Sequence, residues 1–340
     1  MPASVLEWGV RLILALQGWG KWLVGPMNVI TFTGSTEFYL LIMPALYWCW
    51  NSRLGLRTGV GLLLSASLNS ILKLALHDPR PYWFDPRVQL LTGAETSFGL
   101  PSGHSQTAAM VWGIAGAYLR RGWGWALVAV AIALVGFSRA FLGVHFPTDV
   151  FLGWAIGLLA LVLFLQLETP VTKWMKARSP VQQIVLLFVL SLIIVLAGAL
   201  ASRSVSATWQ LPSAWARNAN AQAPHEPFNP LSIDGLVLGA GAFYGLTAGA
   251  VWMVSTGRSF DPGGPWLKRL GRYLVGVVGV LILWQGLGAF FSLLVEDETA
   301  LGYALRFVRY ALIGAWVSAG GPLAFVRLGL AQAESDRDQG

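Results

Sequence analysis

Three short segments of the chain contain side chains that together could bind and cleave a phosphate group. The first is "KLALHDPRP", with Lys73 and Arg80, the second is "PSGH", and the third is "SRAFLGVHFPTD". Lysine offers a point charge and arginine a planar fork of N–H donors, and both suit phosphate oxygens. Histidine can serve as an acid, a base or a nucleophile near neutral pH. The residue types therefore indicate chemistry on an anionic phosphoryl group.

The "PSGH" segment is predicted to begin a helix. Ser102 is a good N-cap residue, and Gly103 lets the backbone come close to a ligand. The first N–H groups of a helix have no partner within it and point outward with the positive end of the helix dipole, so they can hold phosphate oxygens. His104 then lies beside the bound phosphate, where it can act as acid or base.

The third segment pairs His145 with Asp149. Pro147 suits the first turn of a helix, which places His145 just before that helix and Asp149 within its first turn. A carboxylate there can accept one imidazole N–H and leave the other ring nitrogen unprotonated, as a nucleophile requires. Arg139, six residues before His145, adds a third cation. Two histidines with different neighbours can divide the roles of nucleophile and acid.

Long apolar runs must position these segments. Of the 340 residues 55% are hydrophobic and 11% charged, against about 25% charged residues in soluble proteins. A helix that crosses a bilayer needs about 20 apolar residues, and the backbone cannot remain unpaired in lipid. The runs lack the period-two alternation of a membrane barrel. We therefore predict an all-α, polytopic membrane bundle of about nine transmembrane helices. The predicted spans are residues 35–50, 55–76, 102–119, 123–142, 147–168, 181–201, 231–254, 273–294 and 303–326.

Lysine and arginine set the predicted orientation. They gather in the loops that follow alternate spans, for example at Arg53 and Lys173, which places the N-terminus outside and the C-terminus in the cytoplasm. The three motifs then lie at the outer ends of the spans. Lys73, Arg80 and Arg139 lie on this outer face, although the positive-inside rule places most cations on the cytoplasmic face. We therefore expect that they bind an anion there. We expect the active site on the extracytoplasmic face.

Together, "K-x6-RP", "PSGH" and "SR-x5-H-x3-D" resemble the three-part signature of the type 2 phosphatidic acid phosphatase (PAP2) superfamily. The resemblance implies a helical membrane phosphatase that needs no metal and no cofactor. It implies that His145 attacks phosphorus and becomes a phosphohistidine, that Asp149 orients it, and that His104 protonates the leaving oxygen and then activates water. The residues that would hold the phosphoryl oxygens are Lys73, Arg80, Ser102, Gly103 and Arg139.

A finer likeness is to the glucose-6-phosphatase branch. "RPYW", and a Glu-Thr pair at Glu95 ahead of "PSGH", are similar to that branch. Tyr82 and Trp83 suit an interfacial aromatic belt equally well. His77 and Asp78, inside the first motif, either touch the substrate or shape the loop.

The chain divides into five predicted segments. They are an N-terminal interfacial amphipathic segment (1–34), a PAP2-like catalytic membrane core (35–201), an extracytoplasmic loop (202–230), additional C-terminal transmembrane helices (231–326) and a polar tail (327–340). The loop fits either a mobile cap or a plain connector. The small residues of "GLVLGAGAFYGLTAGA" favour tight helix packing, either internal or in a homodimer. The net charge of +7 lies in loops between spans, so we expect no nucleic-acid partner.

The leading prediction is a phosphatase that acts on a membrane lipid phosphate or diphosphate, such as phosphatidate or an isoprenyl diphosphate. A sugar-phosphate phosphatase and a lipid phosphotransferase could use the same residues. Vanadate-dependent haloperoxidases share the anion pocket of the superfamily but are soluble, so the spans argue against them. A transporter or lipid-binding protein without turnover is the alternative of another class. Transporter sites lie near the bilayer midplane, whereas these residues lie at the outer ends of spans.

Overall fold

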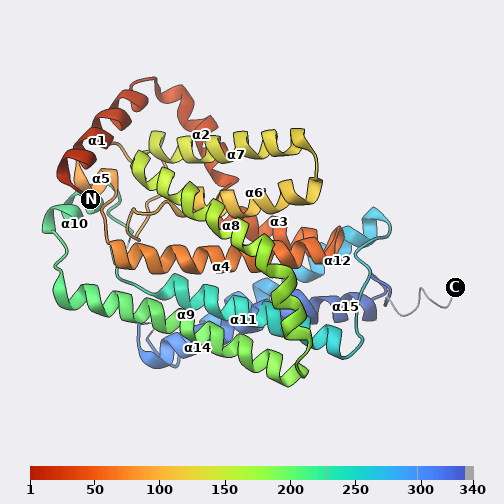
Figure 1. Cartoon of the computed structure of the whole chain (residues 1–340). Coiled ribbons are helices and arrows are strands. Elements are labelled where there is room, and N and C mark those ends of the chain that lie inside the picture. The colour runs from red at the N-terminus through yellow and green to blue at the C-terminus, as the bar shows by residue number, and fades with distance from the viewer. Residues whose placement is uncertain (227, 297, 334–340) are drawn as a thin grey trace. The chain divides into compact units, whose positions relative to one another are not determined.

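The computed structural model describes residues 1–226, 228–296 and 298–333, which form helices joined by loops (Figure 1). The helices are α1 (Ala3–Gln17), η1 (Lys21–Leu23), α2 (Val24–Phe32), α3 (Thr36–Cys49), α4 (Ser52–Leu76), α5 (Pro81–Phe84), α6 (Gly103–Leu119), α7 (Gly122–Phe141), α8 (Pro147–Lys176), α9 (Pro180–Thr208), α10 (Ser213–Gln222), α11 (Asp234–Ser255), α12 (Trp266–Leu281), η2 (Ile282–Gly286), α13 (Leu287–Ser292), α14 (Ala300–Ala315), η3 (Trp316–Gly320) and α15 (Gly321–Arg327). Within these ranges the only β pairing is one isolated bridge, so the predicted all-α class is confirmed. Residues 334–340 of the predicted polar tail lie outside the described residues.

Every predicted span corresponds to a helical run, but the count of nine transmembrane helices is not confirmed. Among the described residues, six helices are long and apolar enough to cross a membrane. The number rises to seven if η1–α2 and α3, which meet at 44°, form one broken span. Helix α6 has only 17 residues, and α14 carries Arg306 and Arg309 within its 16 residues. The predicted number of transmembrane helices is therefore higher than the observed number because α6 is short and α14 is charged.

The chain folds into two compact units, and each is described by itself. The first contains residues 1–39, 68–163 and 197–233, and the second contains residues 40–67, 164–196 and those from 234 onward. All three sequence motifs belong to the first unit.

In the first unit, α6 and α7 form an antiparallel hairpin, and α1 and α2 pack against α7 (Figure 1). Helix α1 is amphipathic and buries Val10 and Ile13 in a cluster that also contains Phe141, Phe146 and Trp83. The apolar face of α1 therefore supports the corner between α7 and α8. The predicted position of this helix at the membrane interface stays a prediction.

The corner between α7 and α8 is a tight turn in which two backbone N–H groups share one carbonyl acceptor. The backbone N–H groups of Val144 and His145 both donate to the carbonyl oxygen of Arg139, at 3.2 and 3.4 Å. Pro147 then begins α8, as predicted, with Asp149 in its first turn. The turn fixes His145 with respect to both helices.

Helices α6 and α8 approach each other closely at Gly153. A Cβ atom there would lie 2.6 Å from the carbonyl oxygen of Ser102 and 3.1 Å from Cβ of Ser105. One helical turn away, the backbone N–H of Ser102 donates to the carbonyl oxygen of Asp149 at 2.9 Å. The missing side chain at Gly153 thus allows a backbone hydrogen bond that joins the second motif to the third.

Residues 202–230, which the sequence predicts to be a loop, contain the last turns of α9 and the whole of α10. Asn218 Nδ2 donates to the carbonyl oxygen of Trp83 at 2.8 Å, and Gln222 Nε2 donates to that of Val88 at 2.9 Å. Gln222 Oε1 also accepts from the backbone N–H of Leu90 at 2.7 Å. Side-chain amides on one face of α10 therefore dock it on α5 and the segment after it.

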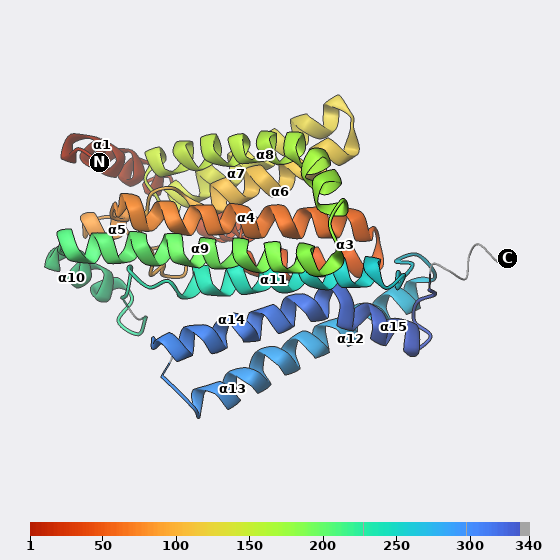
Figure 2. The ribbon, with the colours of Figure 1, turned by 60° about the horizontal axis from the view of Figure 1, so that its bottom comes forward.

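In the second unit, α11 and α14 lie side by side (Figure 2). Their contact uses the small residues of α11: a Cβ atom at Gly245 would lie 1.8 Å from the carbonyl oxygen of Ala311. This glycine-rich stretch, for which the sequence left open internal packing or a homodimer face, thus packs against α14 of the same chain.

The contact at Gly153 generates a stability prediction. We expect Gly153→Ala to lower the thermal midpoint of the protein in detergent, because a methyl group without room typically costs about 1–3 kcal/mol. Gly235→Ala is the matched control, since a Cβ atom there meets nothing within 4 Å on a helix. Equal midpoints for the two variants would contradict the close approach of α6 and α8.

Candidate active site

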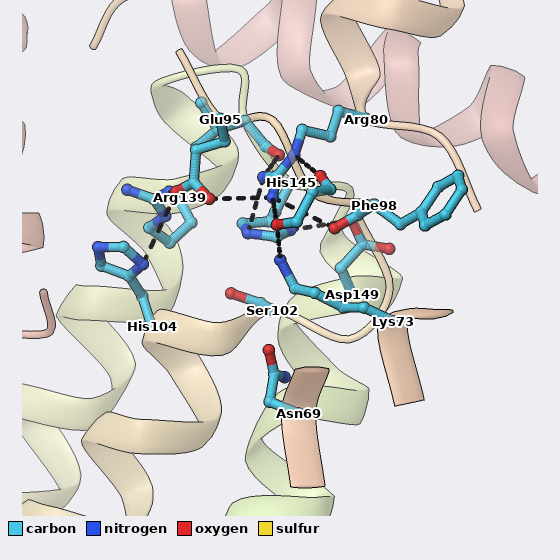
Figure 3. Close-up of polar contacts among 12 residues, drawn as sticks. Asn69, Lys73, Arg80, Glu95, Phe98, Ser102, His104, Arg139, His145 and Asp149 are labelled. Carbon is cyan, nitrogen blue, oxygen red and sulfur yellow. Dashed lines mark hydrogen bonds and ion pairs between the residues drawn. The ribbon is translucent and has the colours of Figure 1, made fainter. Parts of the chain in front are cut away.

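The structure gathers the polar side chains of all three motifs in the interior of the first unit (Figure 3). Lys73 comes from the last turn of α4, Arg80 precedes α5, and Arg139 comes from the last turn of α7. Ser102 caps α6, where its Oγ accepts from the backbone N–H of Ser105 at 3.4 Å, as its N-cap prediction requires. These four side chains are buried, as are those of His145 and Asp149.

His145 is held by two neighbours on opposite sides of its ring. Nδ1 lies 3.2 Å from Asp149 Oδ2, which also accepts from the backbone N–H of Phe146 at 2.9 Å. Nε2 lies 3.2 Å from Arg80 Nη1. With Asp149 accepting the Nδ1 proton, we assign the tautomer whose Nε2 is unprotonated and accepts from Arg80 Nη1. Burial, followed by the charges of Arg80 and Lys73, holds the pKa of the His145 imidazole well below its usual range. A low pKa keeps the imidazole uncharged, which is the form that a histidine nucleophile requires.

Ser97 joins two of the cations, although nothing in its sequence context distinguished it. Its Oγ accepts from Lys73 Nζ at 2.9 Å and from Arg80 Nη2 at 3.1 Å, and its carbonyl oxygen accepts from Arg80 Nε at 2.6 Å. Carbonyl oxygens of Val144 and Phe98 accept two further bonds from Arg80, at 3.0 and 3.2 Å. The guanidinium is thus fixed mainly by backbone oxygens.

Thr31 and Asn69 position the other parts of the cluster, and the sequence interpretation missed both. Thr31 Oγ1 accepts from Arg139 Nη1 at 2.8 Å. Asn69, one helical turn before Lys73, donates to the carbonyl oxygen of Pro101 at 3.2 Å and to Gln106 Oε1 at 2.9 Å. A buried amide in an otherwise apolar span was the available signal for Asn69.

Glu95 lies among the cations as well. Its Oε2 accepts from Arg80 Nη2 at 2.9 Å, its Oε1 accepts from Arg139 Nη2, and His104 Nδ1 is 3.9 Å from Oε1. The side chains of Glu95 and His104 are 25% and 21% exposed, so they form the accessible side of the cluster. Burial alone would raise the pKa of Glu95, but the charges of Arg80 and Arg139 hold it well below its usual range.

The remaining residues of the first motif shape the loop. The ring of His77 lies 4.9 Å from that of Trp209, and the carbonyl oxygen of Asp78 accepts from the backbone N–H of Gly99 at 2.9 Å. Tyr82 and Trp83 are 1% and 0% exposed, so the aromatic-belt interpretation is wrong for both. The Tyr82 hydroxyl donates to the carbonyl oxygen of Glu95 at 3.0 Å and accepts from its N–H at 3.2 Å.

Three buried cations, the N-terminus of a helix and a histidine held by a carboxylate meet inside one unit of this membrane protein. Such a set of groups suits a phosphate-like anion. Residues 54–173 match the model of the PAP2 superfamily. Residues 237–333 match a second model, described as the transmembrane extension of PAP2 superfamily phosphatases. The chain belongs to the PAP2 superfamily of integral membrane phosphatases.

Curated relatives have similar sequences over parts of the chain. Phosphatidylglycerophosphatase B of Bacillus subtilis is 33% identical over 155 residues, which cover 42% of this chain and 73% of that protein. Lipid phosphate phosphatase delta of Arabidopsis thaliana is 27% identical over 194 residues, covering 51% of this chain and 45% of the relative. Glucose-6-phosphatase 3 of Bos taurus is 30% identical over 178 residues, covering 45% and 51%. The chain thus spans about half the length of the plant and bovine relatives.

The contact between Thr31 and Arg139 generates a binding prediction. We expect Thr31→Val, which keeps the side-chain shape, to weaken the binding of inorganic phosphate by about tenfold, because Arg139 loses its neutral anchor and the preorganisation that it gives. Titration calorimetry of the detergent-solubilised protein measures the dissociation constant. Thr33→Val is the matched control, because the Thr33 hydroxyl donates to the carbonyl oxygen of Ile30 in the last turn of α2, and no contact of it with Arg139 is seen among the described residues. Equal dissociation constants for the two variants would show that Thr31 does not position the arginine.

Proposed function

We propose that this protein is a metal-independent phosphatase that hydrolyses a lipid phosphate or diphosphate through a phosphohistidine intermediate. The observation that carries the proposal is the setting of His145. Its Nδ1 is held by Asp149 at 3.2 Å, while its Nε2 points at the cationic side of the cluster, 3.2 Å from Arg80. A nucleophile needs this combination of a fixed orientation and an unprotonated nitrogen next to positive charge.

The proposed reaction has two displacements. In the first, His145 Nε2 forms a bond to phosphorus as the bond to the leaving oxygen breaks, and His104 gives a proton to that oxygen. In the second, His104 takes a proton from a water molecule, whose oxygen attacks phosphorus as the bond to Nε2 breaks. Inorganic phosphate leaves and His145 is regenerated. His104 Nδ1 lies 3.9 Å from Glu95, which contacts Arg80, the neighbour of His145, so both histidines belong to one cluster (Figure 3). This shared setting supports the division of roles.

The phosphoryl oxygens would be held by Lys73, Arg80 and Arg139 and by the start of α6. In the described part of the chain, Nε of Arg139 is buried and has no hydrogen-bond partner, so it is available to a ligand. The N–H of Ser102 is already used by Asp149. Ser102 would therefore contribute its hydroxyl, and the backbone contribution would begin at the N–H of Gly103.

The surroundings of the accessible side favour a lipid substrate. Helix α2, whose Thr31 contacts Arg139, exposes Val29 and Phe32, which are 70% and 44% accessible. In a bilayer such side chains face acyl chains, so a substrate tail could lie along α2 while its phosphate enters the cluster. Arg120 and Arg121 follow the far end of α6, about 25 Å from Ser102 at 1.5 Å per residue. By the positive-inside rule, this supports an extracytoplasmic site.

A sugar phosphate is the second candidate substrate. The Tyr82 hydroxyl and Glu95, from the two segments that resemble the glucose-6-phosphatase branch, are bonded to each other next to the cluster. The match to a bovine glucose-6-phosphatase supports the same candidate. A lipid phosphotransferase would use the same first displacement, with a lipid or sugar hydroxyl in place of water.

A substrate panel tests the proposal. Purified protein with a metal chelator is incubated with phosphatidate, an isoprenyl diphosphate, a sphingoid phosphate and glucose 6-phosphate, and the released phosphate and the products are measured. We expect release from a lipid substrate, a loss of about a thousandfold or more in His145→Ala, and a loss of about a hundredfold or more in Asp149→Asn, which removes the oriented tautomer. A brief reaction stopped in alkali should trap phosphate on His145.

His225→Ala is the matched control, because His225 is exposed and belongs to none of the three motifs. Release of phosphate by His145→Ala at the wild-type rate would overturn the mechanism. An absence of release from every substrate by the wild type would favour the transporter or binding protein. Transfer of phosphate to an added lipid, with none to water, would identify a phosphotransferase.

A further inference from the structure

Glu95 occupies the position between two arginines that the proposed function gives to phosphoryl oxygens. One carboxylate oxygen accepts from Arg80 and the other from Arg139, and His104 approaches from the third side (Figure 3). A carboxylate and a phosphoryl group present the same kind of acceptor to a guanidinium. The two cannot use the same N–H donors at the same time.

Each arginine has an anchor other than Glu95. Arg80 donates to the backbone oxygens of Ser97, Val144 and Phe98, and all three bonds are 3.2 Å or shorter. Arg139 keeps its bond to Thr31 Oγ1 at 2.8 Å. If Glu95 leaves, both guanidinium groups stay where they are, with donors freed toward the same point.

Glu95 is also the member of the cluster best able to move. Its backbone is fixed by two hydrogen bonds with the Tyr82 hydroxyl, so a rotation of the side chain is sufficient. The side chain is 25% exposed, whereas that of Arg80 is fully buried. A small pocket beside it, lined in part by Ala94, Ala219 and Phe228, lies on the side of the α10 segment.

We propose that Glu95 is a specificity-determining residue that acts as an internal competitor for the phosphate site. This inference rests on the proposed function. Substrate binding is then an exchange, in which the phosphoryl oxygens replace the carboxylate and Glu95 turns outward. Anions that bind the arginines weakly do not displace it, so the site stays closed to them. After hydrolysis the returning carboxylate competes with the product phosphate for the arginines and opposes its rebinding.

The proposal is tested by whether removing the charge of Glu95 tightens or weakens the binding of inorganic phosphate. The dissociation constant of inorganic phosphate is measured by titration calorimetry on wild type and Glu95→Gln, which keeps the size of the side chain and removes its charge. If the open form of the free protein is about one molecule in ten or fewer, Glu95→Gln binds phosphate about tenfold tighter or more, because the competent fraction approaches one. Glu226→Gln is the matched control, since Glu226 also lines the neighbouring pocket but is exposed and no contact of it with the arginines is seen.

Tighter binding in Glu95→Gln, with Glu226→Gln like wild type, supports the internal competitor. Equal or weaker binding in Glu95→Gln overturns it and makes Glu95 a residue that merely orients the arginines. An absence of phosphate binding in every protein also overturns it, since nothing would then be competed for. Thermal midpoints with and without phosphate show that each variant is folded. Since no turnover is measured, a protein that binds phosphate without hydrolysing a substrate would overturn the proposed function and leave this test intact.

Discussion

The first unit is organised around the burial of three positive charges in a small volume. Lys73, Arg80 and Arg139 all lie in the interior, where an unpaired charge is far more unfavourable than in water. The three cations donate hydrogen bonds to backbone oxygens, to the hydroxyls of Ser97 and Thr31, and to the carboxylate of Glu95. The loop between the first two motifs follows the path it does because its oxygens must reach these cations.

The same charges set the properties of the histidines. A positive field beside His145 opposes its protonation, and burial acts in the same direction, so the imidazole stays neutral. Asp149 holds the ring from the other side, and its own position is secured by the N–H of Phe146 and by the backbone bond between its carbonyl and Ser102. The proposed binding of an anion and the proposed activation of His145 would therefore both follow from one electrostatic arrangement.

The sequence was sufficient to predict the helical runs, the cap at Ser102 and the convergence of three distant motifs, because hydropathy, capping and residue spacing are local signals. It could not predict the partners Thr31 and Ser97, because single hydroxyl residues carry no periodicity and acquire a role only through tertiary contact. Helix α10 was missed because its polar composition is also that of a loop. The predicted count of nine spans is not confirmed, because α6 is short and α14 carries charge.

The corner between α7 and α8 limits how this chain can change during evolution. The turn closes on the carbonyl oxygen of Arg139, and Asp149, in the first turn of α8, meets His145, which lies just before that helix. One inserted residue here would rotate the carboxylate by about 100° away from the imidazole. In the segment between Arg80 and Ser102, the contacts do not depend on helical spacing in this way. Its ends are held by hydrogen bonds, and a longer loop would still allow these bonds to form. Insertions and deletions among descendants of this chain should therefore accumulate between the first two motifs and be absent from the third.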